Sequence, residues 1–269
     1  ILVGSFLVVF QRNQLWKDTV TFLRADLALN PNAPPMRWFL AETLRVQGDL
    51  EGAKAEYEKI IEQDLSYIGV SNAYSHIGDY YRKREQFDKA EEYYAKSIEA
   101  AGEKNYKSYN NFGAFQEEQG QYLKALVNFC KALKIDQTAP EPQANYNRIA
   151  SMIQTVEDDE FIFLYQDVMQ GGAFAAAEEQ VAVFRDKRCA YGSCLYQFGL
   201  QAPEGEILFP FLITATAFPQ EVLRILDPQF NPASQTITLS VDEKYKDKLL
   251  TFSFPACSGK RYEIEVAPL

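Results

Sequence analysis

Residues 71–102 carry apolar and small side chains at the spacing of two consecutive helices. In the first half, one helical face would hold Tyr74, Ile77, Gly78 and Tyr81. After a polar break, a second face would hold Phe87, Ala90, Tyr94, Ser97 and Ile98. Intervals of three and four positions are typical of a helix with one buried side. Because Gly78 and Ala90 have little or no side chain, the two backbones can approach closely. The segment therefore predicts a helical hairpin.

The same pattern recurs on both sides of this segment. The upstream copy contains Leu40, Ala41, Leu44, Gly48, Leu50, Ala53, Tyr57 and Ile60. The downstream copy contains Tyr109, Phe112, Gly113, Gly120, Tyr122, Ala125, Phe129 and Ala132. The equivalent small residues Ala41, Gly78 and Gly113 lie 37 and 35 positions apart. A helical pair that recurs about every 34 residues resembles the tetratricopeptide repeat. The resemblance covers residues 34–137, with a half repeat before it that ends at Asn30-Pro31.

The resemblance implies an α-helical solenoid in which each helical pair covers the apolar face of its neighbour. The last pair then needs a capping helix, which we expect from residues 143–154. Two positions depart from the pattern of the family. Gln116 stands where an aromatic residue is usual, and Glu85 replaces the glycine of a turn.

In the family that the sequence resembles, the first helix of each pair lines a concave groove. The matching positions here are Trp38, Glu42, Arg45, Asn72, Asp79, Arg82, Lys107 and Asn110. They carry both signs of charge and one tryptophan, which differs from the basic clamp that some members use for a terminal carboxylate. Such a mixture suits a peptide or a neighbouring subunit as partner. The alternative is that these side chains are only solvated.

The charge of the chain argues against a nucleic-acid partner. The formal net charge is −10, and the 27 lysines and arginines do not gather into a basic stripe. A protein that binds nucleic acid needs such a stripe to neutralise phosphates. We therefore expect protein partners, with other copies of this chain first among them.

Residues that could support catalysis are scarce. His76 is the single histidine, and it falls within a repeat helix, where we expect a packing or helix-surface role. The acidic pairs Asp158-Asp159 and Glu178-Glu179 lie in charged runs typical of helix faces or caps. The sequence has no glycine-rich phosphate loop and no HExxH or GxSxG motif. We expect no catalytic residues, no cofactor and no metal site, and hence no enzymatic activity.

The chain opens on ten uncharged residues, of which the apolar members are Ile1, Leu2, Val3, Phe6, Leu7, Val8, Val9 and Phe10. A helix that spans a membrane needs about 20 residues. The segment is therefore interpreted as the end of a longer membrane span, as the mature terminus of a processed precursor, or as an assembly element that another copy covers. Residues 12–18 resemble the junction in polytopic glycosyltransferase-like membrane proteins that carry repeat tails. That resemblance implies repeats outside the cytoplasm, with attachment to a membrane at the N-terminus.

After Cys189 the apolar period changes from 3.6 to 2, as in half-buried strands. Three such strands are predicted at 236–241, 250–254 and 262–266, and two more at 194–200 and 207–218. Before them, 161–169 is ambiguous between helix and strand, and 173–188 is predicted to be helical because it is rich in alanine. We therefore divide the chain into an apolar segment (1–10), a solenoid with its cap (11–155), a helical linker (156–188) and a small antiparallel β-sandwich (189–269).

The cysteines are Cys130, Cys189, Cys194 and Cys257. Cys189 and Cys194 flank a loop short enough to be closed by a disulfide, which we expect to form. Four cysteines allow three complete pairings, and the sequence does not choose among them. A zinc site would need tighter spacing. A disulfide favours an oxidising compartment.

These observations lead to a non-enzymatic assembly or scaffold protein outside the cytoplasm. We expect it to associate with itself into a fibre or envelope array through its apolar N-terminus and its repeat surface. The alternative is the extracytoplasmic interaction tail of a membrane-bound glycosyltransferase-like protein, and a soluble enzyme is the weakest of the three hypotheses.

Overall fold

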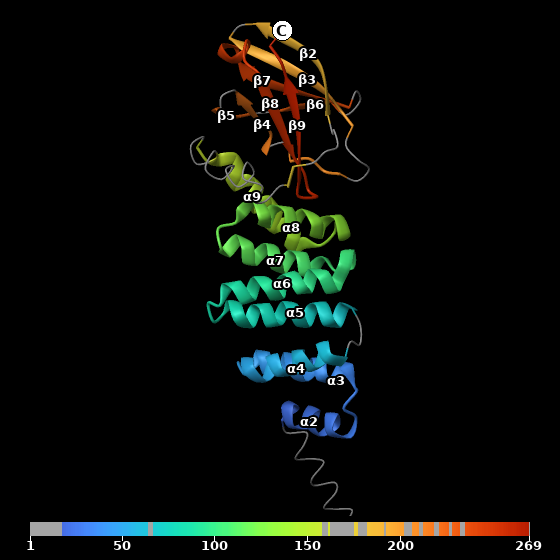
Figure 1. The fold of residues 1–269 in the computed structure, drawn as a ribbon. Coiled ribbons are helices and arrows are strands. Elements are labelled where there is room, and N and C mark those ends of the chain that lie inside the picture. Colours follow the sequence, from blue (N-terminus) through green and yellow to red (C-terminus); the bar gives the residue numbers. More distant parts are fainter. Residues whose placement is uncertain are drawn as a thin grey trace, which may run out of the picture. The chain divides into compact units, whose positions relative to one another are not determined.

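The computed structural model of the chain describes residues 18–63, 67–157, 161, 175–176, 182–190, 192–201, 206–209, 212–217, 221–225, 228–231 and 235–268. The predicted assembly segment 1–10 and residues 12–17 of the junction lie outside them, as do 162–169 and the pairs Asp158-Asp159 and Glu178-Glu179. The described part folds first into helices and then into strands (Figure 1).

The described helices are α2 (Thr19–Leu29), α3 (Pro34–Val46), α4 (Leu50–Gln63), α5 (Tyr67–Arg82), α6 (Phe87–Ala101), α7 (Tyr106–Glu118), α8 (Tyr122–Ile135) and α9 (Pro140–Thr155). Asp18 caps α2 by accepting hydrogen bonds from the backbone N–H groups of Val20 and Thr21. Pro34 and Pro140 begin α3 and α9, where a missing N–H leaves no helical bond unmade. None of these helices combines the length and the apolar character that a membrane span requires.

In two of the helical hairpins, a glycine on the first helix allows a buried aromatic ring of the second helix to come close. A Cβ atom added at Gly78 would lie 3.0 Å from the ring of Tyr94, and one added at Gly113 would lie 2.7 Å from the ring of Phe129. Both rings are almost fully buried. The predicted close approach of paired helices is therefore present, and it explains why these positions recur as small residues.

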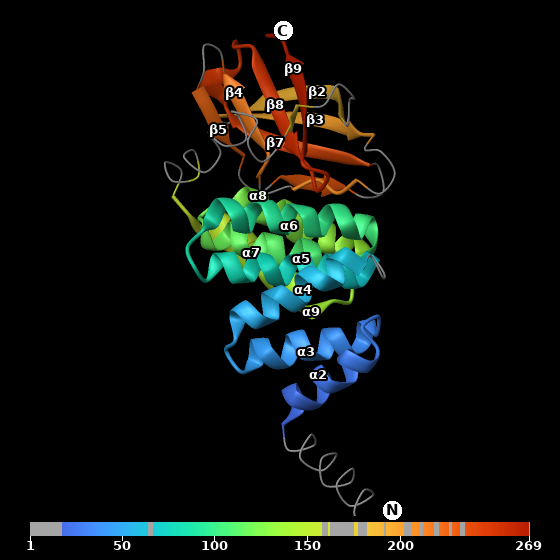
Figure 2. The ribbon, with the colours of Figure 1, turned by 60° about the horizontal axis from the view of Figure 1, so that its bottom comes forward.

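The strands form two sheets. One has the order β1-β9-β8-β4-β5 and the other β2-β3-β7-β6. Their bounds are β1 (Ala175–Ala176), β2 (Ala182–Ala190), β3 (Ser193–Leu200), β4 (Thr214–Ala217), β5 (Glu221–Arg224), β6 (Gln229–Asn231), β7 (Thr236–Asp242), β8 (Leu250–Pro255) and β9 (Lys260–Val266). Adjacent strands run antiparallel except for β1 and β9, which run parallel. Figure 2 shows β8 beside β9 and β2 beside β3.

Aromatic side chains fill the space between the two sheets. The ring centroid of Phe252 on β8 lies 4.9 Å from that of Phe198 and 5.0 Å from that of Tyr196, both on β3. All three side chains are buried, and they belong to one apolar cluster drawn from both sheets. The predicted β-sandwich is thus confirmed, with one parallel pair added to an otherwise antiparallel fold.

The helix predicted over 173–188 is wrong. Two strands, β1 and β2, lie in or across this range, so the sheets begin before Cys189 and 156–188 is not a helical linker. The β2 backbone pairs with β3, and Phe184 packs near Phe198, with ring centroids 5.7 Å apart. Pairing and burial of this kind outweigh a local preference for helix, which is a weak determinant.

The division of the chain also differs from the prediction. It forms two compact units, Ile1–Phe112 and Gly113–Leu269, so the boundary falls within α7. In the second unit, α8 and α9 share one apolar cluster with Phe209, Leu212 and Cys257 of the β part. Arg224 of β5 donates hydrogen bonds of 2.7 to 3.1 Å to the last carbonyls of α9, at Ile153, Gln154 and Val156. The last two helices, α8 and α9, and the sandwich therefore form one folded body.

A disulfide between Cys130 and Cys257 strengthens this union. It links α8 to the turn after β8 across a sequence separation of 127 residues. Closing a loop of this length removes so much freedom from the unfolded chain that the bond contributes about 5 kcal/mol in the chain-entropy model. The sequence had left this pairing open.

The turn at Glu85 yields a first prediction. Gly48 and Gly120 occupy the equivalent turns with φ of +86° and +74°, whereas Glu85 adopts φ of +58°. Because a side chain disfavours this conformation, Glu85→Gly should raise the free energy of unfolding by about 0.5 to 1 kcal/mol. Urea unfolding followed by circular dichroism measures the change. Glu91→Gly, at an exposed helical position of α6, should instead lower stability by about 1 kcal/mol. Equal losses in both variants would contradict the assignment.

Candidate functional site

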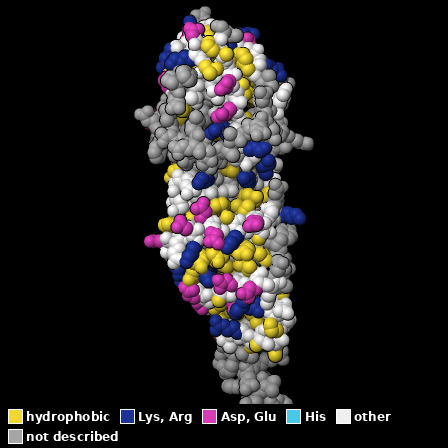
Figure 3. Space-filling model, viewed as in Figure 1, with side chains coloured by type: hydrophobic (Ala, Val, Ile, Leu, Met, Phe, Trp, Pro, Cys, Tyr) yellow, Lys and Arg dark blue, Asp and Glu magenta, His cyan; other side chains and the backbone are white. Residues whose placement is uncertain are grey.

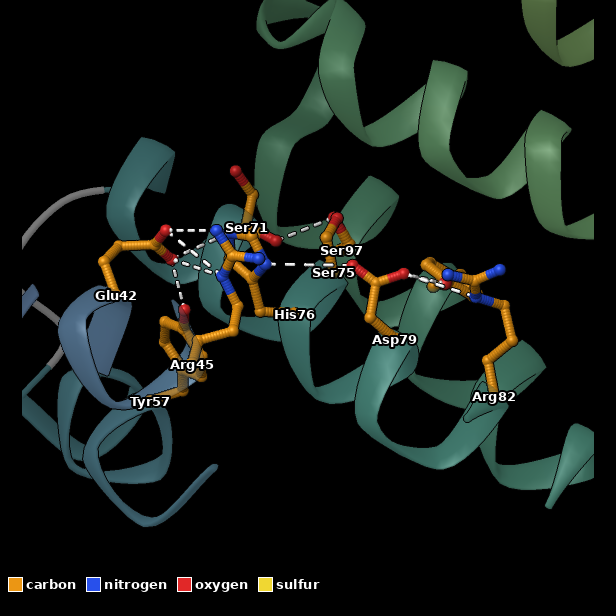
Figure 4. Close-up of polar contacts among 10 residues, drawn as sticks. Glu42, Arg45, Tyr57, Ser71, Ser75, His76, Asp79, Arg82 and Ser97 are labelled. Atoms are coloured by element: carbon orange, nitrogen blue, oxygen red, sulfur yellow. Dashed lines mark hydrogen bonds and ion pairs between the residues drawn. The ribbon is translucent and has the colours of Figure 1, made fainter. Parts of the chain in front are cut away.

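Polar side chains from three helices of the first unit meet around Glu42. We call this group the polar cluster, and it consists of Glu42, Arg45, Tyr57, His76, Asp79 and Arg82 (Figure 4). Residues 42 and 45 come from α3, residue 57 from α4, and the other three from α5. Spacings of three positions place each acid–arginine pair on one helical face, which explains why the groups converge.

Glu42 is the most heavily bonded member of the polar cluster. The Arg45 guanidinium donates to its carboxylate through Nη2 at 2.7 Å and through Nε at 3.2 and 3.3 Å. The Tyr57 hydroxyl also donates a hydrogen bond to this carboxylate. Burial acts to raise the pKa of Glu42, but the bonds from Arg45 and Tyr57 outweigh it and hold the pKa below the ordinary value. Glu42 is therefore a fixed anion that orients its neighbours.

His76 lies between two carboxylates and against two aromatic rings. Its Nε2 is 3.4 Å from Glu42 and its Nδ1 is 3.8 Å from Asp79. The imidazole stacks on Tyr57 with ring centroids 4.9 Å apart, and the ring of Trp38 lies 5.6 Å from both. Burial lowers the pKa of His76 below its usual value of 6.5, although both carboxylates act to raise it. The imidazole is therefore neutral near pH 7 and packs as an aromatic ring.

The second hairpin repeats the arrangement of the first. The hydroxyl of Tyr94 on α6 donates to Asp79 at 2.7 Å, and the Nε of Arg82 lies 3.5 Å from the same carboxylate. Asp79 thus corresponds to Glu42, since each acid directly follows the small residue of its helix.

The next repeat has none of the three polar residues, the acid, the arginine and the tyrosine, at the equivalent positions. Ala114 replaces the acid, Glu117 replaces the arginine, and Phe129 replaces the tyrosine. A buried tyrosine hydroxyl needs an acceptor, so acid and hydroxyl are kept or lost as a pair. Glu117 instead bonds Arg148 of α9.

A cavity of about 150 Å³ adjoins the polar cluster. Its cationic lining residues are Arg45, Lys54, Arg82 and Lys83, and its other lining residues are Leu50, Ala53, Tyr57, His76, Asp79 and Tyr80. Three of these cations already have acidic partners: Arg45 lies 2.7 Å from Glu42, Lys54 lies 2.5 Å from Glu58, and Arg82 lies 3.5 Å from Asp79. Figure 3 shows acidic and basic side chains intermixed over the helices. An arginine carries five N–H donors, so an arginine that is paired with one carboxylate can still donate to another.

A buried hydroxyl network joins α5, α6 and the start of α7. The hydroxyl of Ser97 donates to the backbone carbonyl of Ser71 at 2.7 Å. It also forms hydrogen bonds with the hydroxyls of Ser108 and Ser75, at 2.8 and 2.7 Å. Asn105 donates to Ser71 and to the side chain of Asn72, both at 2.9 Å. This network fixes the side chain of Asn72 where α5, α6 and the start of α7 meet.

The structure brings together five of the eight predicted groove residues, namely Trp38, Glu42, Arg45, Asp79 and Arg82. Asn72 belongs to the hydroxyl network, and the backbone of Lys107 bonds Asn105 at 3.2 Å. Asn110 lies half-buried on α7. Three residues were missed as polar partners: Tyr57 and Tyr94 counted only as core, and His76 only as a packing or surface residue. A signal was available, because each acid is followed 15 positions later by a tyrosine.

This arrangement is suited to binding. Glu42 accepts hydrogen bonds from Arg45 and Tyr57, Asp79 accepts one from Tyr94, and the ring of His76 packs against those of Tyr57 and Trp38, so these side chains are held in place. In the part of the chain that the structure describes, no three metal-ligating side chains gather.

The single histidine yields a second prediction. Because the folded pKa of His76 is depressed, the unfolded chain binds a proton first as the pH falls through 6.5. This contribution to stability is present above pH 6.5 and is lost below it, with a slope of at most about 1.4 kcal/mol per pH unit for one proton. Urea unfolding should show this loss as the pH falls below 6.5. His76→Gln should lack it, while all other groups titrate alike. An imidazole resonance that titrates at or above pH 6.5 in the folded chain would refute the assignment.

Known proteins resemble the helical part of the chain. A tetratricopeptide repeat family model matches residues 34–103 and again residues 69–138, in agreement with the repeats predicted over 34–137. No curated protein matches the chain.

Similar solved structures include the first tetratricopeptide domain of Spaghetti (RPAP3) bound to an HSP90 peptide, the tetratricopeptide domain of OM64 from Arabidopsis, and MamA. Their sequence identities are 16%, 17% and 15%, with TM-scores of 0.40, 0.38 and 0.43. They cover 45%, 45% and 59% of this chain and 96%, 96% and 91% of their own.

The repeat spacing, the paired helices with their small-residue contacts and the double match of the family model agree with one another. Residues 34–138 therefore belong to the tetratricopeptide repeat family.

Proposed function

We propose that the first unit binds an extended segment of a partner protein. An acidic side chain of this segment enters the cavity that Arg45, Lys54, Arg82 and Lys83 help to line. The observation that carries the proposal is the lining of the cavity, where the basic side chains Arg45, Lys54, Arg82 and Lys83 gather beside Tyr57 and His76. The rings of Trp38, Tyr57 and His76 beside it supply apolar surface. Aromatic and arginine side chains are the residues that most often dominate binding energy at protein interfaces.

The bonding within the polar cluster supports binding without large rearrangement. Arg45 is held by Glu42, and Asp79 is held by Tyr94, so little side-chain freedom remains to be lost when a partner binds. We accordingly propose that the chain acts as a scaffold without catalysis.

Binding to peptides tests this proposal. Acidic, neutral and basic decapeptides would be screened on an array, and the strongest binder would be titrated by calorimetry. Trp38→Ala and Arg82→Ala should each weaken binding by about 1 to 3 kcal/mol, which is typical of interface anchors. Lys96→Ala, an exposed cation on α6 paired with Glu92, is the matched control and should leave affinity unchanged. Wild-type affinity in both groove variants, or a preference for basic peptides, would refute the proposal.

We further propose that the chain works outside the cytoplasm. All four cysteines are paired, which supports an oxidising compartment, because thiols stay reduced in most cytoplasms. A tail of a membrane-bound glycosyltransferase-like protein would occupy the same side of a membrane, and it remains our second candidate on the strength of residues 12–18.

Self-association through residues 1–10 completes the proposal. Ten largely apolar residues can bury several hundred Å² in another copy, at about 25 cal/mol per Å² before ordering costs. A head-to-tail contact of this kind forms filaments when its rotation does not close. Electron microscopy of the native protein should show assemblies that deletion of residues 1–10 abolishes. Monomers that need detergent, with an association state unchanged by the deletion, would favour the membrane-attached alternative instead.

A further inference from the structure

The disulfide between Cys189 and Cys194 lies across the hairpin of β2 and β3. The two cysteines are direct partners in the ladder, with Cα atoms 4.0 Å apart, and they are separated by 5 positions in sequence. β2 is the outer strand of its sheet. Cys189 is exposed, whereas Cys194 is fully buried. One end of this bond is thus open to reagents in water while the other end belongs to the core.

The second disulfide of the chain has the opposite character. Cys130 and Cys257 are both buried, within the cluster that joins α8 and α9 to the β part. A thiolate can attack a disulfide only where it can reach a sulfur atom. The chain therefore carries one accessible and one protected disulfide.

The hairpin disulfide also adds little to the stability of the fold. It closes a much shorter loop than the 127 residues spanned by Cys130 and Cys257, and the stabilisation falls with loop length. The β2–β3 register runs from Ala182 opposite Leu200 to Ala190 opposite Ser193. This ladder and the burial of Tyr196 and Phe198 hold the hairpin without the disulfide. The bond can therefore open while the sandwich stays folded.

We propose that Cys189–Cys194 is a site of thiol–disulfide exchange with a dithiol, in the folded protein. A thiolate of the dithiol attacks the sulfur of Cys189, the bond to Cys194 breaks, and the sulfur of Cys194 leaves as a thiolate that takes up a proton. The second thiol of the dithiol then attacks the mixed disulfide and releases Cys189. The protein gains two electrons and two protons, and the dithiol becomes a disulfide.

Both reduced cysteines remain where they can pair again. Cys194 as a thiol is a small apolar group that suits the core, where it is packed with Tyr196 and Phe198. Cys189 stays opposite it because the ladder fixes the register. Exchange is therefore reversible, and it does not depend on the peptide-binding function proposed above.

Graded reduction of the full chain tests the site. The oxidised protein would be incubated with rising dithiothreitol in native buffer, alkylated, and analysed by peptide mapping. Cys189 and Cys194 should be alkylated at a dithiothreitol concentration lower by about tenfold or more than that needed for Cys130 and Cys257. Circular dichroism of the partly reduced protein should match that of the oxidised protein. Joint reduction of the two disulfides, earlier reduction of Cys130–Cys257, or unfolding on opening of the hairpin bond would overturn the proposal.

Two matched variants test which sulfur is attacked. Cys194→Ala leaves Cys189 as an exposed thiol, and Cys189→Ala leaves Cys194 as a buried one. With an aromatic disulfide reagent, the first variant should form a mixed disulfide about tenfold or more faster than the second. Equal rates, or faster reaction of the second, would refute attack at Cys189.

Discussion

The close contact between a small residue on one helix and an aromatic ring on the next underlies the helical part of this protein. At Gly78 there is no room for a Cβ atom without displacing Tyr94. This contact sets the distance between the paired helices, and it also determines where the tyrosine hydroxyl lies. That hydroxyl reaches Asp79, the residue directly after the glycine. A packing constraint in the core thus places the polar groups at the surface of the groove.

The loss of the polar set from the third repeat follows from the same geometry. Phe129 keeps the aromatic ring that packs on Gly113 but has no hydroxyl, and Ala114 has no carboxylate to accept one. The third repeat has instead become part of a different body. Its second helix α8 and the capping helix α9 share a core with the β part, and Arg224 donates hydrogen bonds to carbonyls at the end of α9. The family pattern therefore persists in a repeat whose surface serves another purpose.

The two disulfides divide structural and chemical roles between them. Cys130–Cys257 joins distant parts of the chain within a buried cluster, where its effect on the unfolded state is large. Cys189–Cys194 joins residues that the ladder already holds opposite each other, at the edge of a sheet. The buried disulfide therefore constrains the unfolded chain, whereas the accessible disulfide can react without loss of the fold.

The sequence alone determined the helical repeats, most strands of the sandwich and four residues of the polar cluster. These follow from local periodicity, since side chains on one face recur about every 3.6 residues in a helix and every 2 residues in a strand. The sequence also indicates the turn at Glu85, where φ is positive, because glycines occupy the equivalent position in the neighbouring copies, at Gly48 and Gly120. Local pattern could not show that residues 182–190 form a strand, because alanine and acidic residues nearby favour helix and only pairing with β3 decides against it. Nor could it show the role of His76, the pairing of Cys130 with Cys257, or the boundary within α7. Each of these depends on contacts between residues far apart in the chain, which only the tertiary structure decides.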